Sequence, residues 1–114
     1  MKKTLDLNKS LLNLDGTEAF EKEDAKDPIL LSKMVAHLIA GSRTPEVMGD
    51  VVSYYDLSTS LFTTGKALVS LSDLNILEGL VRNDTRLSLP AIAQIVKELD
   101  SLRKTFPEPA KIIV

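Results

Sequence analysis

The sequence predicts a small α+β domain that is mainly helical, with about four helices, an N-terminal β-ribbon and a third short strand. Three observations predict this class. Residues 4–20 alternate apolar and polar side chains with a period of two, which is typical of strands. Residues 28–104 carry apolar side chains at helical spacing between proline, glycine and serine signals for helix ends. The chain has 114 residues, a usual length for one domain.

We expect one globular domain over residues 1–104. It would consist of the ribbon at 4–20, a charged linker at 21–27 and the helical part at 28–104. Residues 105–114 contain two prolines that exclude a helix, so we expect a tail or arm there.

The ribbon should contain two short strands with an apolar face, joined by a turn at 8–10 and followed by a second turn at Asp15-Gly16. The alternating leucines of the two strands are Leu5 and Leu7, then Leu12 and Leu14. A lone hairpin is barely stable in water, so this face must pack on another element. An amphipathic helix that starts near residue 8 is the alternative.

The first helix should cover residues 28–40, because Asp27 can cap it, Pro28 suits its first position and Gly41 can end it. A second helix, the longest, should run from Thr44 to about residue 63. Its apolar side would hold Val47, Met48, Val51, Val52, Tyr55 and Phe62.

Residues 67–71 alternate again and should form the third strand, which gives the N-terminal ribbon a partner. Ser72 should then cap a helix that ends near residue 83. Ser88, followed by Pro90, should open the last helix. The inward side chains of that helix would be Ile92, Ile95, Val96, Leu99 and Leu102.

Composition excludes several classes of function. The chain has no cysteine, which excludes disulfides, thiolate zinc sites and a thiol nucleophile. The net charge of -2 gives no overall attraction to nucleic acid. No apolar run approaches the roughly 20 residues that cross a bilayer, and the start of the chain lacks the apolar segment of a signal peptide. We therefore expect a cytoplasmic protein without membrane association, in the host cytoplasm or the virion if a phage encodes it.

No group of residues in the sequence forms a catalytic or cofactor motif. His37 is the only histidine, and a metal site would want a second imidazole or a thiolate. The Gly65-Lys66 pair lacks the upstream glycine and the following hydroxyl residue of a phosphate-binding loop. The carboxylate pairs at 73 and 78 and at 98 and 100 do not have the spacing of neighbours on one helical face. We therefore expect no enzyme activity, no cofactor and no metal.

Residues 72–96 resemble the first half of a winged helix-turn-helix of the leucine-responsive regulator family, in the runs "NILEGL" and "RLSLPAIAQIV". The resemblance implies a DNA-binding regulator that uses residues 72–104. In that family a turn and a recognition helix follow. Here "KELDSLRKTFPEP" continues the same helix, with Glu98 and Asp100 among its basic residues. DNA binding is therefore an alternative and not our main prediction.

Two stretches resemble a loose set of small proteins of tailed bacteriophages and prophages. The residues that match are Leu5, Leu7, Asn8, Lys9, Leu11, Leu12, Leu14 and Gly16, then Val69, Leu71, Ser72, Asp73 and Leu74. The resemblance implies a viral accessory or assembly protein. Its pattern consists of turn and core positions, so a shared fold produces it without a shared function.

The main functional hypothesis is a protein that binds another protein or itself. Adjacent residues on a helix point in different directions, so one ring of Tyr54-Tyr55 should be core and the other exposed, and exposed aromatics anchor interfaces. The tail from Phe106 to residue 114 ends in an apolar run. The candidate interface residues are Tyr54, Tyr55, Phe106, Ile112, Ile113 and Val114. A further alternative is a viral inhibitor that sequesters a host nucleotide signal, so a small-molecule ligand is not excluded.

Overall fold

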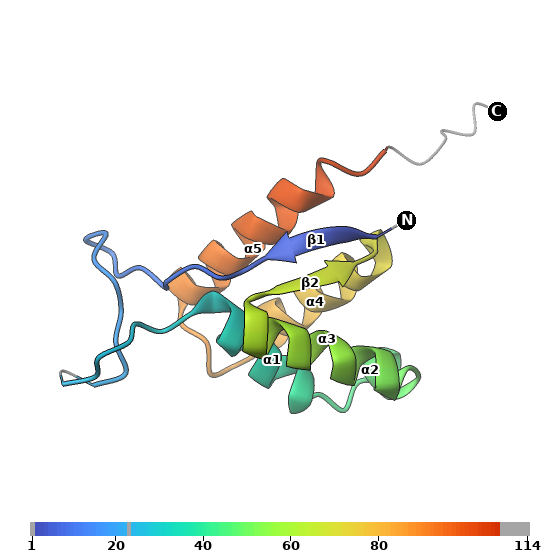
Figure 1. The fold of residues 1–114 in the computed structure, drawn as a ribbon, viewed down its shortest axis with the longest axis horizontal. Helices are drawn as coiled ribbons and strands as arrows, with labels where there is room; N and C mark the ends of the chain where they lie inside the picture. The colour runs from blue at the N-terminus through green and yellow to red at the C-terminus, as the bar shows by residue number, and fades with distance from the viewer. Residues whose placement is uncertain (1, 23, 108–114) are drawn as a thin grey trace.

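Five helices and a two-stranded antiparallel sheet make up the described residues, 2–22 and 24–107, of the computed structural model (Figure 1). The mainly helical α+β class is confirmed, with one helix more than expected. In chain order the elements are β1 (Lys3–Asp6), α1 (Leu31–Ala40), α2 (Pro45–Met48), α3 (Val51–Thr64), β2 (Lys66–Val69), α4 (Leu71–Asn83) and α5 (Leu89–Arg103).

The sheet pairs the N-terminus of the chain with the segment between α3 and α4. β1 and β2 run antiparallel, with Leu5 opposite Ala67 and Lys3 opposite Val69. The side chains of Leu5, Ala67 and Val69 are buried, while Leu68 on the other face is exposed. The predicted third strand and its pairing with the N-terminal strand are therefore confirmed.

The second strand of the predicted ribbon does not form, and no hairpin turns at residues 8–10. Leu7 and Leu11 are buried, whereas Leu12 and Leu14 are exposed, so this segment has no continuous apolar face. Its backbone is bound by isolated bridges, Ser10 to Leu30 and Leu12 to Glu18. The expected turn at Asp15-Gly16 is correct. Gly16 has a positive φ of 87°, and Asn13 N donates to Thr17 O across the turn at 2.7 Å.

α1 begins three residues later than the sequence predicts, and neither Asp27 nor Pro28 starts it. Ile29 is held in an extended conformation by neighbouring backbone groups. Its N–H donates to Ala19 O at 2.8 Å, and its carbonyl accepts from Leu11 N at 2.7 Å. These bonds occupy the backbone of the residue that would have formed the first helical turn.

The predicted single helix at 44–63 is two helices, α2 and α3. Thr44 and Pro45 do start the first, as expected. The backbone then leaves the helical region at Asp50, where φ is -140° and ψ is 59°. After the break α3 packs on α1, and its buried residues are Tyr54, Leu57, Ser58 and Leu61. The prediction that Val51, Val52, Tyr55 and Phe62 face the core is wrong.

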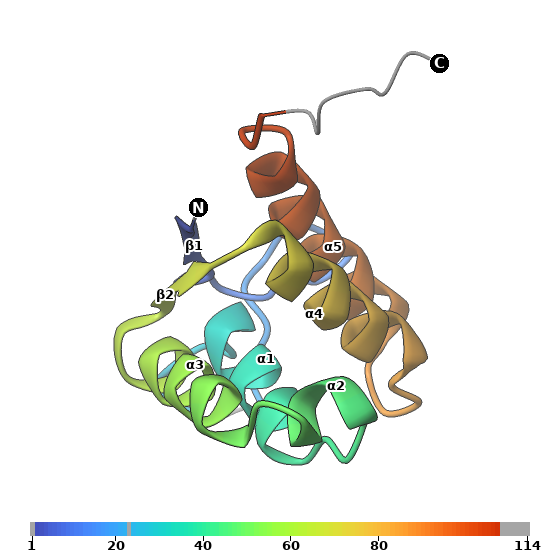
Figure 2. The ribbon, with the colours of Figure 1, turned by 90° about the vertical axis from the view of Figure 1, so that its right-hand side faces the viewer.

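α4 and α5 form the second half of the molecule. Figure 2 shows them on one side, α1, α2 and α3 on the other, and the sheet joining the two groups. Ser70 caps α4 and not Ser72: its hydroxyl accepts from Asp73 N, and the Asp73 carboxylate accepts from Ser70 N. Ser88 caps α5 as predicted, and α5, with 15 residues, is the longest helix.

A single apolar core extends from Leu5 to Phe106. Leu74, Leu77, Ile95 and Leu99 are among its fully buried members, so α4 and α5 supply much of it.

Candidate protein-binding face

The exposed side of α2 and α3 carries a row of apolar side chains. We call Met48, Val51, Val52, Tyr55 and Phe62 the outer α3 face. Val52 is 72 % exposed and Tyr55 is 67 % exposed, although both are large apolar residues on a helix. Scattered surface apolar residues are normal, but a contiguous group on one element marks an interaction site.

The spacing of this face follows the helical repeat. Along α3 the exposed positions 52, 55, 59 and 62 are separated by three, four and three residues, the spacing of a helix seam that meets another helix, and Met48 extends the row from α2. Thr59 is the polar member of the series and is exposed. The opposite side of α3 packs on α1. α3 therefore has one apolar stripe in the core and a second one facing outward.

Phe62 lies at the C-terminal end of the outer α3 face and is held by two residues of α1. The ring of His37 meets it edge-on, with centroids 5.6 Å apart and an interplanar angle of 79°. The ammonium group of Lys33 lies 5.3 Å from the centre of the Phe62 ring. Both contacts fix the orientation of the Phe62 ring. His37 therefore has a packing role against this ring.

A hollow of about 390 Å³ lies at the other end of the face. The end of α1, α2 and the first turns of α3 form its walls, mainly with apolar atoms. Its lining includes Ile39, Val47, Met48, Val51 and Tyr55, with Arg43 at the edge. The hollow is of the size that accepts an apolar side chain, since a cavity of about 150 Å³ can hold benzene.

Tyr54 and Tyr55 divide between core and surface, as predicted. Tyr54 is only 5 % exposed, and its hydroxyl donates to the Asp73 carboxylate at 3.3 Å. Burial, and then the negative charge of Asp73, raises the pKa of Tyr54 to about 12. Tyr54 thus connects α3 to the start of α4, and Tyr55 is the ring available to a partner.

Phe106, another predicted interface residue, is not exposed as Tyr55 is. Phe106 is buried, and Lys3 of β1 lies over its ring at 5.3 Å from the centre. Phe106 therefore belongs to the core and is not an exposed anchor. Ile112, Ile113 and Val114 lie outside the described residues.

The exposure of Met48, Val51, Val52 and Phe62 differs from the prediction, because their helical spacing placed them on the apolar side of one helix. A signal for the correct phase was present in Tyr54, Leu57 and Leu61, which are also spaced by three and four residues. Both stripes fit a helix equally well. Packing of α3 against α1 decides between them.

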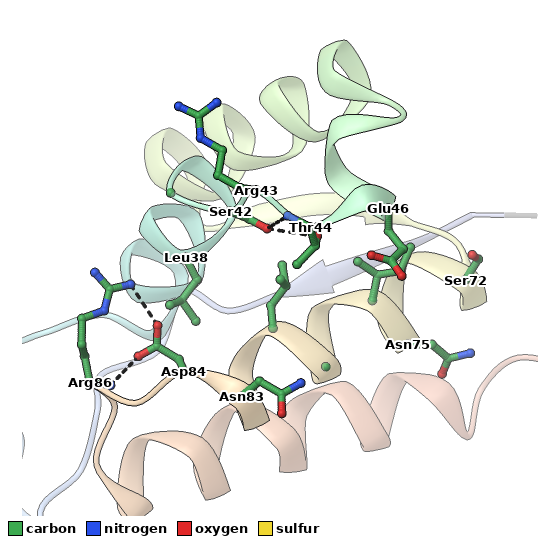
Figure 3. Close-up of a pocket in the computed structure, with 14 residues that line it drawn as sticks. Leu38, Ser42, Arg43, Thr44, Glu46, Ser72, Asn75, Asn83, Asp84 and Arg86 are labelled. Atoms are coloured by element: carbon green, nitrogen blue, oxygen red, sulfur yellow. Dashed lines mark hydrogen bonds and ion pairs between the residues drawn. The ribbon is translucent and has the colours of Figure 1, made fainter.

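A cleft of about 740 Å³ opens between the end of α1, the loop at 41–44 and α4 (Figure 3). Leu38, Ile76 and Leu80 give it an apolar part. On its rim the Arg86 guanidinium donates to Asp84 at 2.9 Å, and this bond lowers the pKa of the Asp84 carboxyl. Arg43 and Arg86 point outward in different directions, so the cleft does not gather two cations around one point (Figure 3).

The arrangement of titratable groups offers no metal site in the described part of the chain, where no three His, Asp or Glu side chains form a cluster. The Glu78 carboxylate is paired with two arginines. Glu78 lies 3.0 Å from Arg103 and 3.1 Å from Arg82. Burial by itself raises the pKa of Glu78, but the two arginines outweigh it and keep the pKa below the usual range.

Residues 72–104, which resemble half of a helix-turn-helix, form α4 and α5 with a connection at 84–88. α5 runs without a break from Leu89 to Arg103, so the residues after Val96 continue the helix as the sequence predicts. Two of its charges are used within the chain: Glu98 accepts from Lys9 at 2.7 Å, and Arg103 pairs with Glu78. A surface that binds DNA needs basic side chains free to reach phosphates.

Across residues 2–22 and 24–107, none of the helices combines the length and the apolar character needed to cross a bilayer.

Comparison with family models, with curated proteins and with solved structures finds no match to this chain. The resemblance to phage and prophage proteins therefore stays a prediction.

Proposed function

We propose that the protein acts by binding another protein through the outer α3 face, without catalysing a reaction. One observation carries this proposal: five large apolar side chains are exposed together on α2 and α3, while α3 already buries a separate stripe in the core. Side chains exposed to water in this way do not stabilise the folded chain. A partner that covers them removes apolar surface from water, which favours binding.

The composition of the face supports binding to a protein surface. Tyrosine, phenylalanine and methionine are enriched in the centres of protein interfaces, and charged residues are depleted there. The outer α3 face contains the first three types and no charged residue. Tyr55 is the expected anchor, because it has the largest exposed ring and a hydroxyl that can find a partner.

Site-specific photo-cross-linking tests the proposal. A benzophenone side chain is placed at Val52 and, as a matched control, at Leu89 of α5, which is 78 % exposed but lies outside the face. In cells that produce the chain, ultraviolet light should cross-link position 52 to a protein and leave position 89 unlinked. Absence of cross-links from position 52, or equal yields from both positions, would contradict the proposal.

The resemblance of the sequence to phage and prophage proteins extends the proposal to an accessory or assembly role in the host cytoplasm or the virion. The identity of the cross-linked protein tests this extension. A viral protein as the cross-linked partner supports it. A host metabolic enzyme as the only product counts against it.

A second candidate function is sequestration of a small molecule in the cleft at α4. Its support is the volume of about 740 Å³, which is within the range of ligand pockets. Thermal unfolding against a panel of nucleotides tests it, because a ligand of the native state raises the melting temperature. Gly79 lines the cleft with open space where a side chain would begin, so Gly79→Leu should remove any shift that Gly79→Ala retains. No shift with any nucleotide rejects this candidate.

A further inference from the structure

The outer α3 face is complementary to itself. At one end Phe62 is exposed and is held in place by His37 and Lys33. At the other end lies the apolar hollow bounded by Met48, Val51 and Tyr55. A two-fold interface uses the same patch on both subunits, so it needs a projection and its receiving site on one patch. Both are present here, on one pair of consecutive helices.

We propose that the partner is a second copy of this chain, bound face to face about a two-fold axis with the two α3 helices antiparallel. The inference rests on the proposed function, because the same face does the binding. Phe62 lies eleven residues after Val51, which is about 16 Å along a helix. Only an antiparallel arrangement brings the Phe62 ring of each copy to the hollow of the other.

The charge of the patch permits this pairing. A two-fold axis brings each side chain near its own counterpart or near other members of the same patch, so like charges on the patch would repel. Its members are Met48, Val51, Val52, Tyr55 and Phe62, with Thr59 between them, and all are uncharged. The pairing brings Lys33, which lies over Phe62, toward the partner's Arg43 at the hollow, but both cations are exposed to solvent, which screens their repulsion. The whole chain has a net charge of only -2, so long-range repulsion between copies is small.

The area of the face places the pair among small, transient interfaces. With aromatic side chains of about 150–250 Å², the exposed parts of the five residues amount to roughly 500 Å². Two copies would then bury on the order of 1,000 Å² in total, the lower limit for a specific interface. We therefore expect a reversible dimer with a Kd on the order of 10–100 μM and not an obligate one.

Sedimentation of the full-length chain over a range of concentrations measures the dimer directly. The wild type should shift from monomer to dimer with the expected Kd. Val52→Asp should raise the Kd at least about tenfold, because it puts two carboxylates into the apolar contact. Leu89→Asp, the same change at an exposed leucine at the start of α5, should leave the Kd unchanged. Equal melting temperatures of the variants and the wild type exclude unfolding as the cause.

Cross-linking of the purified chain tests the direction of the helices. A benzophenone at position 62 should link to the partner's segment at 45–51, and mass spectrometry should identify that peptide. Links from position 62 to position 62 would overturn the antiparallel pairing. A chain that stays monomeric at about 1 mM overturns the dimer as a whole, as does a Kd that Val52→Asp leaves unchanged. If that monomer still cross-links from position 52 to another protein in cells, the proposed function stands and only this inference fails.

Discussion

Replacing Gly65 by alanine tests the junction between the N-terminal strand and the end of α3. Gly65 has a positive φ of 78°, and a Cβ there would lie 2.4 Å from Asn8 Cβ and 3.0 Å from Asn8 Cα. The residue also accepts a backbone hydrogen bond from Leu7 N at 2.8 Å. Because a backbone atom of Asn8 is involved, side-chain rotation cannot relieve the contact, and the chain after β1 must move.

The expected cost of Gly65→Ala is about 3–4 kcal/mol of the free energy of unfolding. The left-handed conformation accounts for about 1–2 kcal/mol of it. Weakening the Leu7–Gly65 hydrogen bond adds about 1 kcal/mol, and the displaced Leu7 side chain, which is fully buried, adds a similar amount from poorer packing.

Two other glycines separate these contributions. Gly16 also has a positive φ, 87°, but no atom lies within 4 Å of its would-be Cβ, so Gly16→Ala should cost only about 1–2 kcal/mol. Gly79 lies inside α4 with open space around it, so Gly79→Ala should stabilise by about 0.5–1 kcal/mol. Urea denaturation followed by circular dichroism measures all three. Equal losses at positions 65 and 16 would refute the close approach of Asn8.

Three further predictions concern the helices. Leu77→Ala should lower the unfolding free energy by about 2–5 kcal/mol, since the side chain is fully buried, and a urea midpoint close to that of the wild type would contradict this. The folded pKa of Glu78 is depressed by Arg103 and Arg82, so its stabilising effect is complete above the unfolded pKa and is lost as the pH falls through the folded value. Between about pH 7 and pH 3 the wild type should therefore lose more stability than Glu78→Gln, and parallel curves would exclude the effect. In an ultraviolet titration one phenol of the wild type should ionise near pH 12, and Tyr54→Phe should remove that step without removing the other tyrosine signal.

Local signals predicted the elements whose ends depend on nearby residues. Ser88 and Pro90 started the last helix in the expected place, and Asp15-Gly16 formed the expected turn. At α4 the cap is Ser70 and not Ser72, although the sequence contained the deciding signal. Ser70 has an acidic residue three positions later, which completes a capping box, and Ser72 does not.

Long-range backbone bonds explain the errors at the N-terminal half. The segment at 7–20 alternates like a strand, but it pairs with itself only at Leu12 and Glu18, and its Ser10 pairs with the distant Leu30. The bridge from Ser10 to Leu30 and the bond from Ile29 to Ala19 also delay the start of α1. No local propensity encodes such bonds, because their donors and acceptors are brought together only by folding.

The outer α3 face likewise depends on contacts between elements that are distant in the chain. Helical periodicity predicted one amphipathic helix from 44 to about 63, which covers most of α3, but α3 has apolar residues on two sides, and periodicity does not say which side is buried. Packing against α1 buries Tyr54, Leu57 and Leu61, and leaves Val52 and Tyr55 exposed.

The amino-acid order alone determined the class of the fold, most of the helices, the strand tendency of the N-terminus and of the segment before α4, and the lack of cysteine chemistry. These features follow from short-range preferences and from composition, which act before the chain is folded. Only the tertiary structure decided which stripe of α3 meets the core and where the apolar hollow forms. Both depend on how helices distant in the chain come together.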